Sequence, residues 1–544
     1  MNRLCTFRTW LGACLLALAA GAAVAESVAA AAPAGAGLET VDFETLALRL
    51  GTAGFSEKQQ LVEQLAAAAD PRVPALFEAL LAGALYRDVV GGGIVAIQGD
   101  RRTPLAGTVR ADAPKAELRK IGLNNGLRSA LRPLLAATRL RDPDPAVRAE
   151  AARTLTGTAP AALAPTLERV RAEETDIAVR DALDIALASL RLADPDPAVR
   201  SAAIAVLTRQ SDKAILTLLE QRAAVEQDAA VAALLGKAIE SLRARERTFA
   251  FVGDLFFGLS LGSVLLLAAV GLAITFGVMG VINMAHGEMI MLGAYTTYVV
   301  QLLMPNHIEW SLAVAVPAAF LVSALVGVAI ERGVIRFLYG RPLETLLATF
   351  GISLILQQLV RTIFSPLNKS VVTPQWLSGS WQVNGMLSLT YNRLYIILFA
   401  LAVLLALVAV LRKTPIGLQM RAVTQNRAMA NSMGIRTGRV DAMTFGLGSG
   451  IAGIAGVALS QLTNVGPNLG QAYIIDSFLV VVFGGVGNLF GTFVAAMGLG
   501  VVTKFTEPLV GAVLAKILIL VFVILFIQWR PRGLFALKGR FVGD

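Results

Sequence analysis

A polar, glycine-rich stretch, Gly277–Glu288, interrupts two long apolar runs of the sequence. It reads Gly-Val-Met-Gly-Val-Ile-Asn-Met-Ala-His-Gly-Glu, so helix-breaking glycines lie beside an amide, an imidazole and a carboxylate. The core of a bilayer holds irregular backbone or ionisable side chains only where protein or a water-filled cavity covers them. The stretch is therefore the first place in this chain to look for a transport pathway.

The apolar segments around this stretch are long enough to cross a membrane. Of the 544 residues, 56% are hydrophobic and only 16% are charged, and most of the charge lies between residue 26 and about residue 248. We expect residues 249–544 to form an all-α polytopic membrane domain with about eight transmembrane segments, two of them broken or re-entrant, since a bilayer core needs about 20 apolar residues per helix. The candidate spans are Leu255–Met279, Glu288–Met304, Trp310–Ile330, Thr345–Phe364, Leu394–Leu411, Val440–Leu462, an interrupted run Ala472–Lys504 with two short arms, and Val510–Gln528.

The first 25 residues have the pattern of a cleaved secretory signal peptide. A basic start is followed by an apolar middle and by the small-residue site Ala23-Val24-Ala25. Both cysteines, Cys5 and Cys14, lie inside this segment. We therefore expect the mature chain to lack disulfides and cysteine-based catalytic or metal sites.

Residues 26–248 are Ala/Leu-rich, and their pattern predicts a soluble α-helical domain. The heptapeptide Asp142–Arg148, Asp-Pro-Asp-Pro-Ala-Val-Arg, returns verbatim as Asp194–Arg200, with a partial echo at Ile177–Arg180. Asp followed by Pro starts a helix, because Asp caps free N–H groups and Pro is tolerated in the first turn. Helix pairs at such a spacing indicate HEAT-like repeats, and an ordinary Ala-rich bundle is the alternative. Tyr86–Thr108 breaks the pattern and predicts a small hairpin or an exposed loop.

The orientation follows from counting crossings. A cleaved signal peptide puts the N-terminal domain outside, and six crossings then return the chain to the outside near Thr463–Gly470. If the interrupted run dips in and returns, the last span ends inside. The basic loop Arg412–Arg439 then also lies inside, as the positive-inside rule requires, whereas the arginines at 243, 245 and 247 argue against this orientation.

Both polar interruptions are candidates for a solute pathway. Asn283, His286 and Glu288 could hydrogen-bond a small polar solute, or tie neighbouring helices together as a buried network. The second interruption comprises Gly484–Asn488, and broken helices in corresponding halves indicate a central binding site in transporters. Close packing through small residues is the alternative there, and it is the preferred interpretation for the glycines of 446–456.

The sequence contains no pattern for catalysis or for an energy source of its own. No phosphate-binding loop, nucleophile elbow or zinc motif is present. A zinc site needs three or four protein ligands, and the sequence has only one histidine, His307, besides His286. We therefore expect no metal site, and we also expect no cofactor and no catalytic residue. The basic residues lie mostly between apolar spans, which argues against nucleic acid as a partner.

The segment Thr414–Ile435 is too long for a passive linker and predicts a short amphipathic helix. Met420, Val423, Met429 and Met433 would form its apolar side. Such a helix would dock on a partner at the inner membrane face or lie on lipid.

Several of these motifs resemble the permeases of branched-chain amino-acid-type ABC importers. The likeness covers about residues 250–544 and rests on Asn283–Glu288, Gly340–Leu343, Gly434-Ile435 and Val482–Gly487. Three further stretches are similar to the urea branch of that family, its permease B subunit: Arg421–Asn426, Asn464–Gly470 and Arg532–Arg540. Asn488 stands where that branch would have Gln.

The resemblance implies a polytopic membrane permease of the inner membrane. It does not cover the N-terminal domain, whose expected periplasmic position follows from the signal peptide and the count of crossings. Its partners would be a second homologous permease subunit, two cytoplasmic ATPase subunits and a periplasmic solute-binding protein. The solute pathway would include Asn283, His286, Glu288, Gly484, Gly485, Gly487 and Asn488. The ATPase-coupling residues would be Gly417, Arg421, Asn426, Ala430 and Gly434.

The implied function is ATP-driven urea import, without enzymatic activity in this chain. Import of branched-chain amino acids or short amides by the same architecture is the alternative. Two alternatives belong to other classes of function: a passive small-solute channel and a membrane-anchored interaction scaffold.

Overall fold

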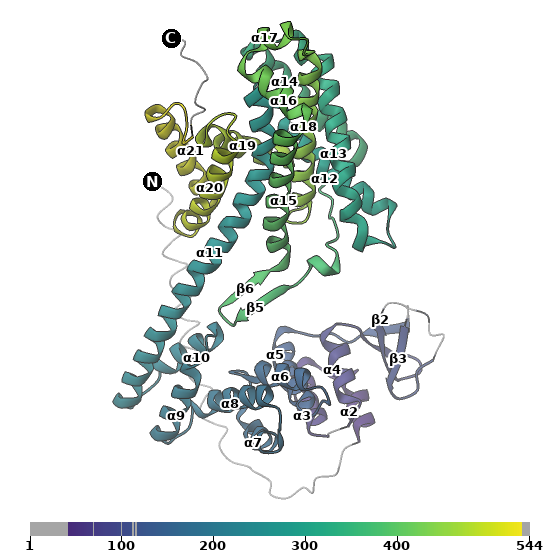
Figure 1. Cartoon of the computed structure of the whole chain (residues 1–544). Coiled ribbons are helices and arrows are strands. Elements are labelled where there is room, and N and C mark those ends of the chain that lie inside the picture. The colour runs from purple at the N-terminus through teal and green to yellow at the C-terminus, as the bar shows by residue number, and fades with distance from the viewer. Residues whose placement is uncertain (1–41, 69, 99–100, 111–113, 115–116, 536–544) are drawn as a thin grey trace, which may run out of the picture. The chain divides into compact units, whose positions relative to one another are not determined.

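The computed structural model describes residues 42–68, 70–98, 101–110, 114 and 117–535, and Figure 1 shows their helices and strands. They divide into two compact units, one ending at Arg191 and the other beginning at Leu192. The expected signal peptide lies outside the described residues. The expected domain boundary at residues 248/249 falls inside a single continuous helix, α11 (Ala229–Met279).

The first unit contains a β-sheet, so the expectation of an all-α chain is wrong here. Three helices, α2 (Phe43–Leu50), α3 (Phe55–Ala67) and α4 (Val73–Leu81), precede four strands: β1 (Leu85–Asp88), β2 (Ile94–Gln98), β3 (Arg101–Ala106) and β4 (Leu118–Lys120). The strands form an antiparallel sheet in the order β3-β2-β1-β4. The Asp88 carboxylate shapes the β1–β2 turn, because it accepts hydrogen bonds from the N–H groups of Val90 and Gly91 at 3.0 Å.

The two verbatim heptapeptides fold in the same way. In the first unit, α5 (Asn125–Arg139) is followed by α6 (Pro145–Leu155), the 3-10 turn η2 (Ala161–Leu163), α7 (Ala164–Glu173) and α8 (Ile177–Arg191). Asp144 caps α6, and Arg148 donates to the Glu174 carboxylate at 2.8 and 2.9 Å and to the Asp142 carbonyl at 2.8 Å.

The second heptapeptide opens α9 (Pro197–Thr208), which is followed by α10 (Lys213–Ala223). Asp196 caps α9, and Arg200 donates to the Glu226 carboxylate at 3.1 and 2.8 Å and to the Asp194 carbonyl at 2.9 Å. Arginine and glutamate are 26 residues apart in both copies. The repeated sequence therefore specifies a repeated ion pair as well as a repeated helix start.

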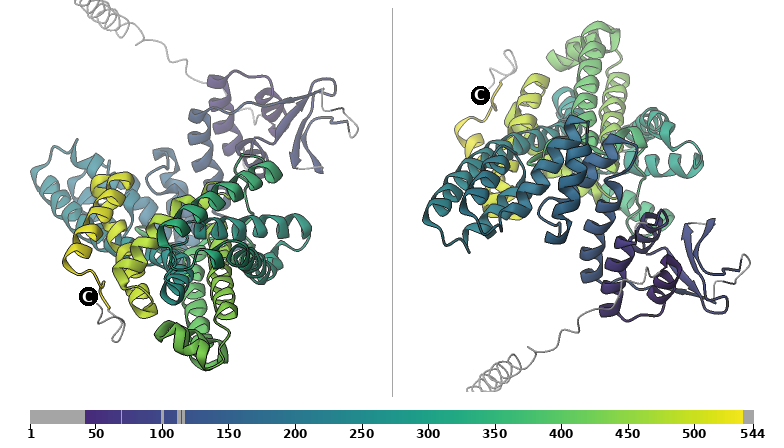
Figure 2. Two further views of the ribbon diagram at one scale, coloured as in Figure 1. Left: turned by 90° about the horizontal axis from the view of Figure 1, so that it is seen from above. Right: turned by 90° about the horizontal axis from the view of Figure 1, so that it is seen from below.

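The rest of the second unit is a bundle of long apolar helices, seen along their length in Figure 1 and end on in Figure 2. After α11 come α12 (His286–Leu303), α13 (Ile308–Gly333), η3 (Ile335–Phe337), α14 (Pro342–Phe364), η4 (Gln375–Leu377) and the hairpin β5 (Ser380–Asn384) and β6 (Leu387–Thr390). Then follow α15 (Tyr391–Lys413), α16 (Pro415–Gln425), α17 (Arg427–Ser432), α18 (Thr437–Ser460), α19 (Leu469–Gly484), α20 (Leu489–Val510) and α21 (Ala512–Trp529).

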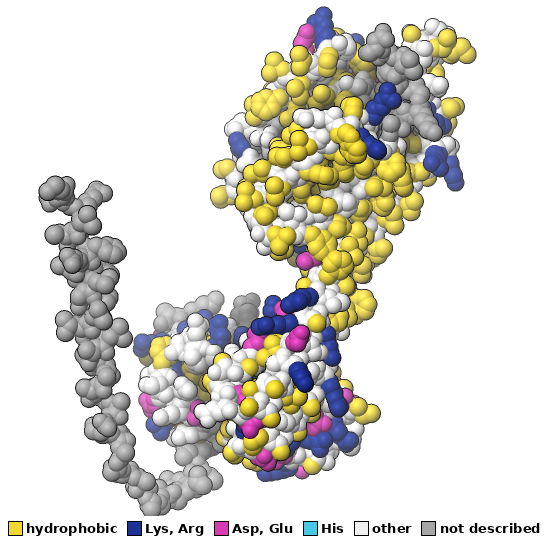
Figure 3. Space-filling model, turned by 90° about the vertical axis from the view of Figure 1, so that its left-hand side faces the viewer, with side chains coloured by type: hydrophobic (Ala, Val, Ile, Leu, Met, Phe, Trp, Pro, Cys, Tyr) yellow, Lys and Arg dark blue, Asp and Glu magenta, His cyan; other side chains and the backbone are white. Residues whose placement is uncertain are grey.

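Within the described residues, seven helices are long and apolar enough to cross a membrane by length and composition: α11, α13 with η3, α14, α15, α18, α20 and α21. The two other apolar helices, α12 and α19, have 18 and 16 residues. The interrupted run does break at Gly484–Asn488, but its second arm, α20, has 22 residues and is a full span rather than a short one. Hydrophobic side chains cover most of the bundle face drawn in Figure 3.

The glycines of α18 bring it into backbone contact with its neighbours, as the packing interpretation of 446–456 predicted. A Cβ atom at Gly448 would lie 2.6 Å from the carbonyl oxygen of Gly271 on α11. One at Gly293 on α12 would overlap the backbone of Gly453. Small residues at these positions allow the close approach of helices that stabilises membrane bundles.

Candidate functional site

The first polar interruption is shorter than the sequence indicated, and it turns back into the bundle. α11 continues through Gly277 to Met279 and ends at Gly280, whose φ of +69° is left-handed. His286 and Glu288 belong to the first turn of α12. His286 Nε2 lies 2.9 Å from the carbonyl oxygen of Ala268, eleven residues before the end of α11, which is about 16 Å along that helix. Hence α12 begins deep within the bundle, beside α11.

The segment 461–468 breaks the second half in a matching way, although it was not among the predicted interruptions. α18 ends at Ser460 and α19 begins at Leu469. A Cβ atom at Gly287 would lie 2.7 Å from the carbonyl oxygen of Gly470, so the first turns of α12 and α19 touch. Helix N-termini carry unpaired N–H groups and partial positive charge, and pairs of them form solute sites in transporters with broken helices.

The predicted interruption at Gly484–Asn488 lies at the turn between α19 and α20. Gly485 and Gly487 have φ of +104° and +80°, and Asn488 caps α20 by accepting from Gly491 N–H at 3.1 Å. Asn488 also donates to the carbonyl of Phe535 at 3.2 Å. A Cβ atom at Gly277 would lie 2.7 Å from Gly487 Cα. The turn Gly484–Asn488 therefore contacts the end of α11, where the first interruption begins. The polar side chains that follow Gly280 lie in another part of the bundle.

Glu288 is the centre of a buried polar cluster built by α12, α14 and α19. Its Oε1 accepts from the Ser353 hydroxyl at 2.9 Å and from the Gln357 amide at 2.8 Å. Gln471, on α19, donates to the Ser353 hydroxyl at 3.5 Å. Glu288 is 1% exposed, and its second oxygen has no partner among the described residues. The cluster thus keeps one free buried acceptor beside the point where α12 and α19 meet.

Asn283 and His286, the other two predicted residues of this stretch, contact backbone groups rather than the Glu288 carboxylate. Asn283 is buried and its Oδ1 accepts from Ala285 N–H at 3.0 Å, which stabilises the turn before α12. His286 is fully buried, and its Nδ1 has no partner among the residues described. In the described part of the chain, no group of three or more His, Cys, Asp or Glu side chains could hold a metal ion.

A polar stripe on α14 is a further feature, which was not among the predictions from the sequence. Thr345, Thr349, Ser353 and Gln357 are each four residues apart, and all are buried. Residues at this spacing share one face of a helix. Arg361, four residues further on, donates to Asn468 Oδ1 at 2.8 Å, just before α19. The four-residue period of polar side chains in an otherwise apolar span could have identified this face.

The segment Thr414–Ile435 forms two helices rather than one. Asn426 ends α16, and its side chain caps α17 by accepting from Met429 N–H at 2.9 Å. Met420 and Val423 are buried within the chain, whereas Met429 and Met433 are 60% and 77% exposed. The predicted continuous apolar side is therefore wrong, because the break at Asn426 gives α17 an orientation of its own.

The other predicted coupling residues hold these two helices in place. Gly417 packs on the backbone of Leu411, and Arg421 donates to the carbonyl of Leu411 near the end of α15. Ala430 is 5% exposed, and Gly434 ends α17 with a φ of +87°.

Arg427, which was not among the predicted coupling residues, links α17 to the bundle. It forms an ion pair with Asp441 on α18, which is 2% exposed, and its guanidinium lies 3.9 Å from the centroid of the Tyr339 ring. The Tyr339 hydroxyl donates to Asp441 Oδ1 at 3.2 Å. Burial, and then the nearby Asp441 carboxylate, raise the pKa of Tyr339 above its ordinary value, so it remains a neutral donor.

A family model described as "Branched-chain amino acid transport system / permease component" matches residues 255–527, which contain the Glu288 cluster, the helix breaks and helices α16 and α17. The chain belongs to this permease family. The high-affinity branched-chain amino acid transport system permease protein LivH of Salmonella typhimurium is 29% identical over 299 residues, covering 53% of this chain and 96% of LivH. The corresponding protein BraD of Pseudomonas aeruginosa is 28% identical over 295 residues, covering 52% and 95%. No solved structure matches the chain.

The chain is accordingly a permease component of a branched-chain amino acid-type ABC transporter, and a transporter component rather than an enzyme. Permeases of such importers work in the membrane with ATPase and binding-protein partners. The apolar helices of the second unit agree with a multi-pass membrane protein.

Proposed function

We propose that this chain is the urea-translocating permease subunit of an ATP-driven importer of the inner membrane. The observation that carries the proposal is the contact between the first turns of α12 and α19 at Gly287 and Gly470, beside the free Glu288 oxygen. Two broken helices meeting within a membrane bundle are typical of a solute pathway. The pathway residues are then Glu288, Ser353, Gln357 and Gln471, with Asn283 and His286 supporting the turn into α12.

Urea suits this cluster chemically. It is neutral and small, with four N–H donors and one carbonyl acceptor, and the cluster offers carboxylate, amide and hydroxyl groups. The stretches Arg421–Asn426, Asn464–Gly470 and Arg532–Arg540, which are similar to the urea branch, favour the same solute. Amino acid import is the second candidate, because LivH and BraD are named for branched-chain amino acids and helix N-termini attract carboxylates.

The turn Gly484–Asn488 would support the inner end of the pathway. Its contacts to Gly277 and Phe535 connect it with the ends of α11 and of the described chain. In this proposal Gly484, Gly485, Gly487 and Asn488 fix the chain geometry there, rather than binding solute through their side chains.

The partners in this proposal are a second homologous permease subunit, two cytoplasmic ATPase subunits and a periplasmic solute-binding protein. Helices α16 and α17 would receive the ATPase movement through Gly417, Arg421, Asn426, Ala430 and Gly434. Arg427 would pass that movement to α18, which contacts α12 along its length through Gly293 and Gly453.

Residues 26–248 would form a periplasmic HEAT-like domain after a signal peptide of residues 1–25, with the permease domain over 249–544. The equivalent Arg148–Glu174 and Arg200–Glu226 pairs support a repeat architecture. Two of the three arginines that argue against a periplasmic N-terminal domain have partners within the chain. Arg243 forms an ion pair with Glu220, and Arg245 donates to the carbonyl of Thr208.

The test is uptake by the whole transporter reconstituted in proteoliposomes with its binding protein outside and ATP inside. We expect accumulation of labelled urea that unlabelled leucine does not reduce, and at least tenfold slower uptake for Glu288→Gln or Gln357→Ala. Glu344→Gln is the matched control, since that carboxylate lies exposed in the first turn of α14 in an ion pair with Arg341.

The alternatives give different results in the same assay. Accumulation of leucine, with inhibition of urea uptake by leucine, would establish amino acid import instead. Urea equilibration without the ATPase subunits would indicate a passive channel. Unchanged transport after deletion of residues 41–245 would make the N-terminal domain accessory, whereas no transport of any solute by the intact complex would favour a membrane-anchored scaffold.

A further inference from the structure

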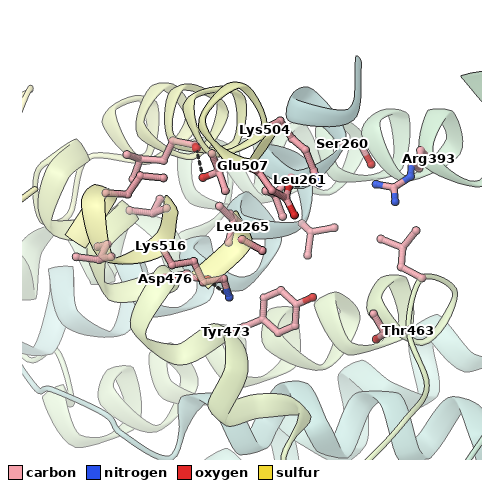
Figure 4. A pocket seen from close by; sticks show the side chains of 18 residues that line it. Ser260, Leu261, Leu265, Arg393, Thr463, Tyr473, Asp476, Lys504, Glu507 and Lys516 are labelled. Atoms are coloured by element: carbon pink, nitrogen blue, oxygen red, sulfur yellow. Dashed lines mark hydrogen bonds and ion pairs between the residues drawn. The ribbon is translucent and has the colours of Figure 1, made fainter. Parts of the chain in front are cut away.

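A second polar site lies away from the Glu288 cluster, in a cavity of about 280 Å³ among α11, α15, α19, α20 and α21 (Figure 4). Its lining is unusual for a membrane bundle, because it includes three cationic and two anionic side chains. Two of the cations are already paired: Lys504 Nζ lies 2.5 Å from Glu507 Oε2, and Lys516 Nζ lies 3.5 Å from Asp476 Oδ2. Arg393 is the cation that remains.

Arg393 has no carboxylate partner among the described residues; its guanidinium lies 5.0 Å from the centroid of the Phe257 ring. Figure 4 shows the two ion pairs on one side of the view and Arg393 on the other, with Ser260, Thr463 and the hydroxyl of Tyr473. Ser260 is 0% exposed, and its hydroxyl has no hydrogen-bond partner in the described chain. A guanidinium without a carboxylate partner and three hydroxyl groups line the same cavity. Together they can donate hydrogen bonds to a bound oxyanion.

The cavity lies at one boundary of the membrane bundle. Arg393 is in the first turn of α15, Thr463 follows the end of α18, and Lys504 and Lys516 flank the α20–α21 turn at residue 511. Four helix ends therefore meet around it. Headgroups of lipids occupy this depth, where long basic side chains reach the interface.

Two of the helices that border the cavity, α15 and α21, lie at the outside of the bundle. The membrane-spanning windows of α15 and α21 are each only 17% buried within the chain. Apolar side chains stand exposed beside the cavity on both helices: Leu398 is 54% exposed, Val513 74% and Ile517 48%. Inside the cavity, the lining also includes the apolar side chains of Leu261, Val264 and Ile519. A ligand with a charged head and apolar chains could place its head in the polar cavity and its chains against the exposed apolar side chains of α15 and α21.

We propose that this cavity binds the phosphodiester headgroup of a phospholipid, with Arg393 as its cationic ligand and with the hydroxyl groups of Ser260 and Tyr473 as donors. The acyl chains would lie along the exposed faces of α15 and α21. The site needs only the membrane location of the chain and is independent of which solute is transported. A bound lipid here would brace α19, the helix whose first turn meets α12, through Tyr473 and the Asp476–Lys516 pair.

The test uses the purified full-length chain in detergent, stripped of lipid, and follows its thermal unfolding midpoint. Three probes are added separately: dioleoylphosphatidylglycerol, dioleoylglycerol (the same chains without phosphate) and inorganic phosphate. We expect phosphatidylglycerol to raise the midpoint by a few degrees and the other two to leave it nearly unchanged. Arg393→Gln should abolish the rise, and Arg341→Gln, which removes an exposed arginine just before α14, should retain it.

Each other outcome overturns the proposal in a recognisable way. An equal rise with inorganic phosphate would make this a site for a free anion. An equal rise with dioleoylglycerol would mean that the acyl chains alone bind. A wild-type response in Arg393→Gln would remove the arginine from the site. If that variant does not fold, Tyr473→Phe and Ser260→Ala take its place, and a full response in both would contradict the proposal.

Discussion

Gly287 and Gly470 bring the backbones of α12 and α19 into direct contact at their first turns. We predict that Gly287→Ala lowers the free energy of unfolding by about 1–3 kcal/mol and reduces uptake strongly, because its methyl group would meet the carbonyl oxygen of Gly470. Unfolding midpoints and proteoliposome uptake measure the two effects. Gly498→Ala is the control: this glycine on α20 has open space around it, so alanine there should be neutral or slightly stabilising. Equal behaviour of both variants would argue against a tight contact.

The Arg427–Asp441 ion pair links α17 to α18 of the bundle. Asp441→Asn leaves the arginine without its counter-charge while keeping the shape of the side chain. We predict that the complex then hydrolyses ATP at near its normal rate but imports at least tenfold less solute per ATP. Arg439→Gln, an exposed neighbour on α18, should change neither rate. Normal import by Asp441→Asn would assign the pair to stability alone.

Arg421 holds α16 to the end of α15 by donating to the carbonyl of Leu411. We predict that Arg421→Glu separates ATP hydrolysis from uptake while membrane insertion remains intact. The physical reason is that a carboxylate beside the C-terminal carbonyls of a helix is repelled by the helix dipole. ATPase activity, uptake and the amount of inserted protein should be measured together. Normal uptake at normal insertion would refute a coupling role for this residue.

The helix breaks after Met279 and at Gly484–Asn488 could be predicted from the sequence because they depend on local chemistry. Glycine at 280 and 485 adopts left-handed backbone, and the side chain of Asn488 begins the next helix. The apolar spans were equally readable, since each is a continuous run. The split at Asn426 was missed although it uses the same capping chemistry, because a helical pattern of methionines seemed to continue through it.

The candidate site was harder to predict because its contacts join residues far apart in the chain. Glu288 is 65 and 69 residues from Ser353 and Gln357. The sequence singled out Glu288 but gave no reason to pair it with α14, or to match Gly287 with Gly470. The four-stranded sheet was likewise ambiguous, since its strands are only three to six residues long and its edge strand β4, which pairs with β1, lies beyond the stretch Tyr86–Thr108.

The last prediction concerns the N-terminal domain, where Arg148 donates to the Glu174 carboxylate. This bond, with smaller contributions from the N–H groups of Asp176 and Thr175, lowers the pKa of Glu174 from its ordinary 4.5 to about 2. A carboxylate with a lowered pKa stabilises the fold fully above its unfolded value and loses that contribution as the pH falls. We therefore expect amide exchange in α6–α8 of the full chain to remain protected down to about pH 4.5, and protection to weaken between there and pH 2. Arg148→Gln should weaken protection already at pH 7 and flatten this acid limb, whereas Arg153→Gln, which removes an exposed pair with Glu150, should do neither. An acid limb of the same size in both variants would mean that another group causes it.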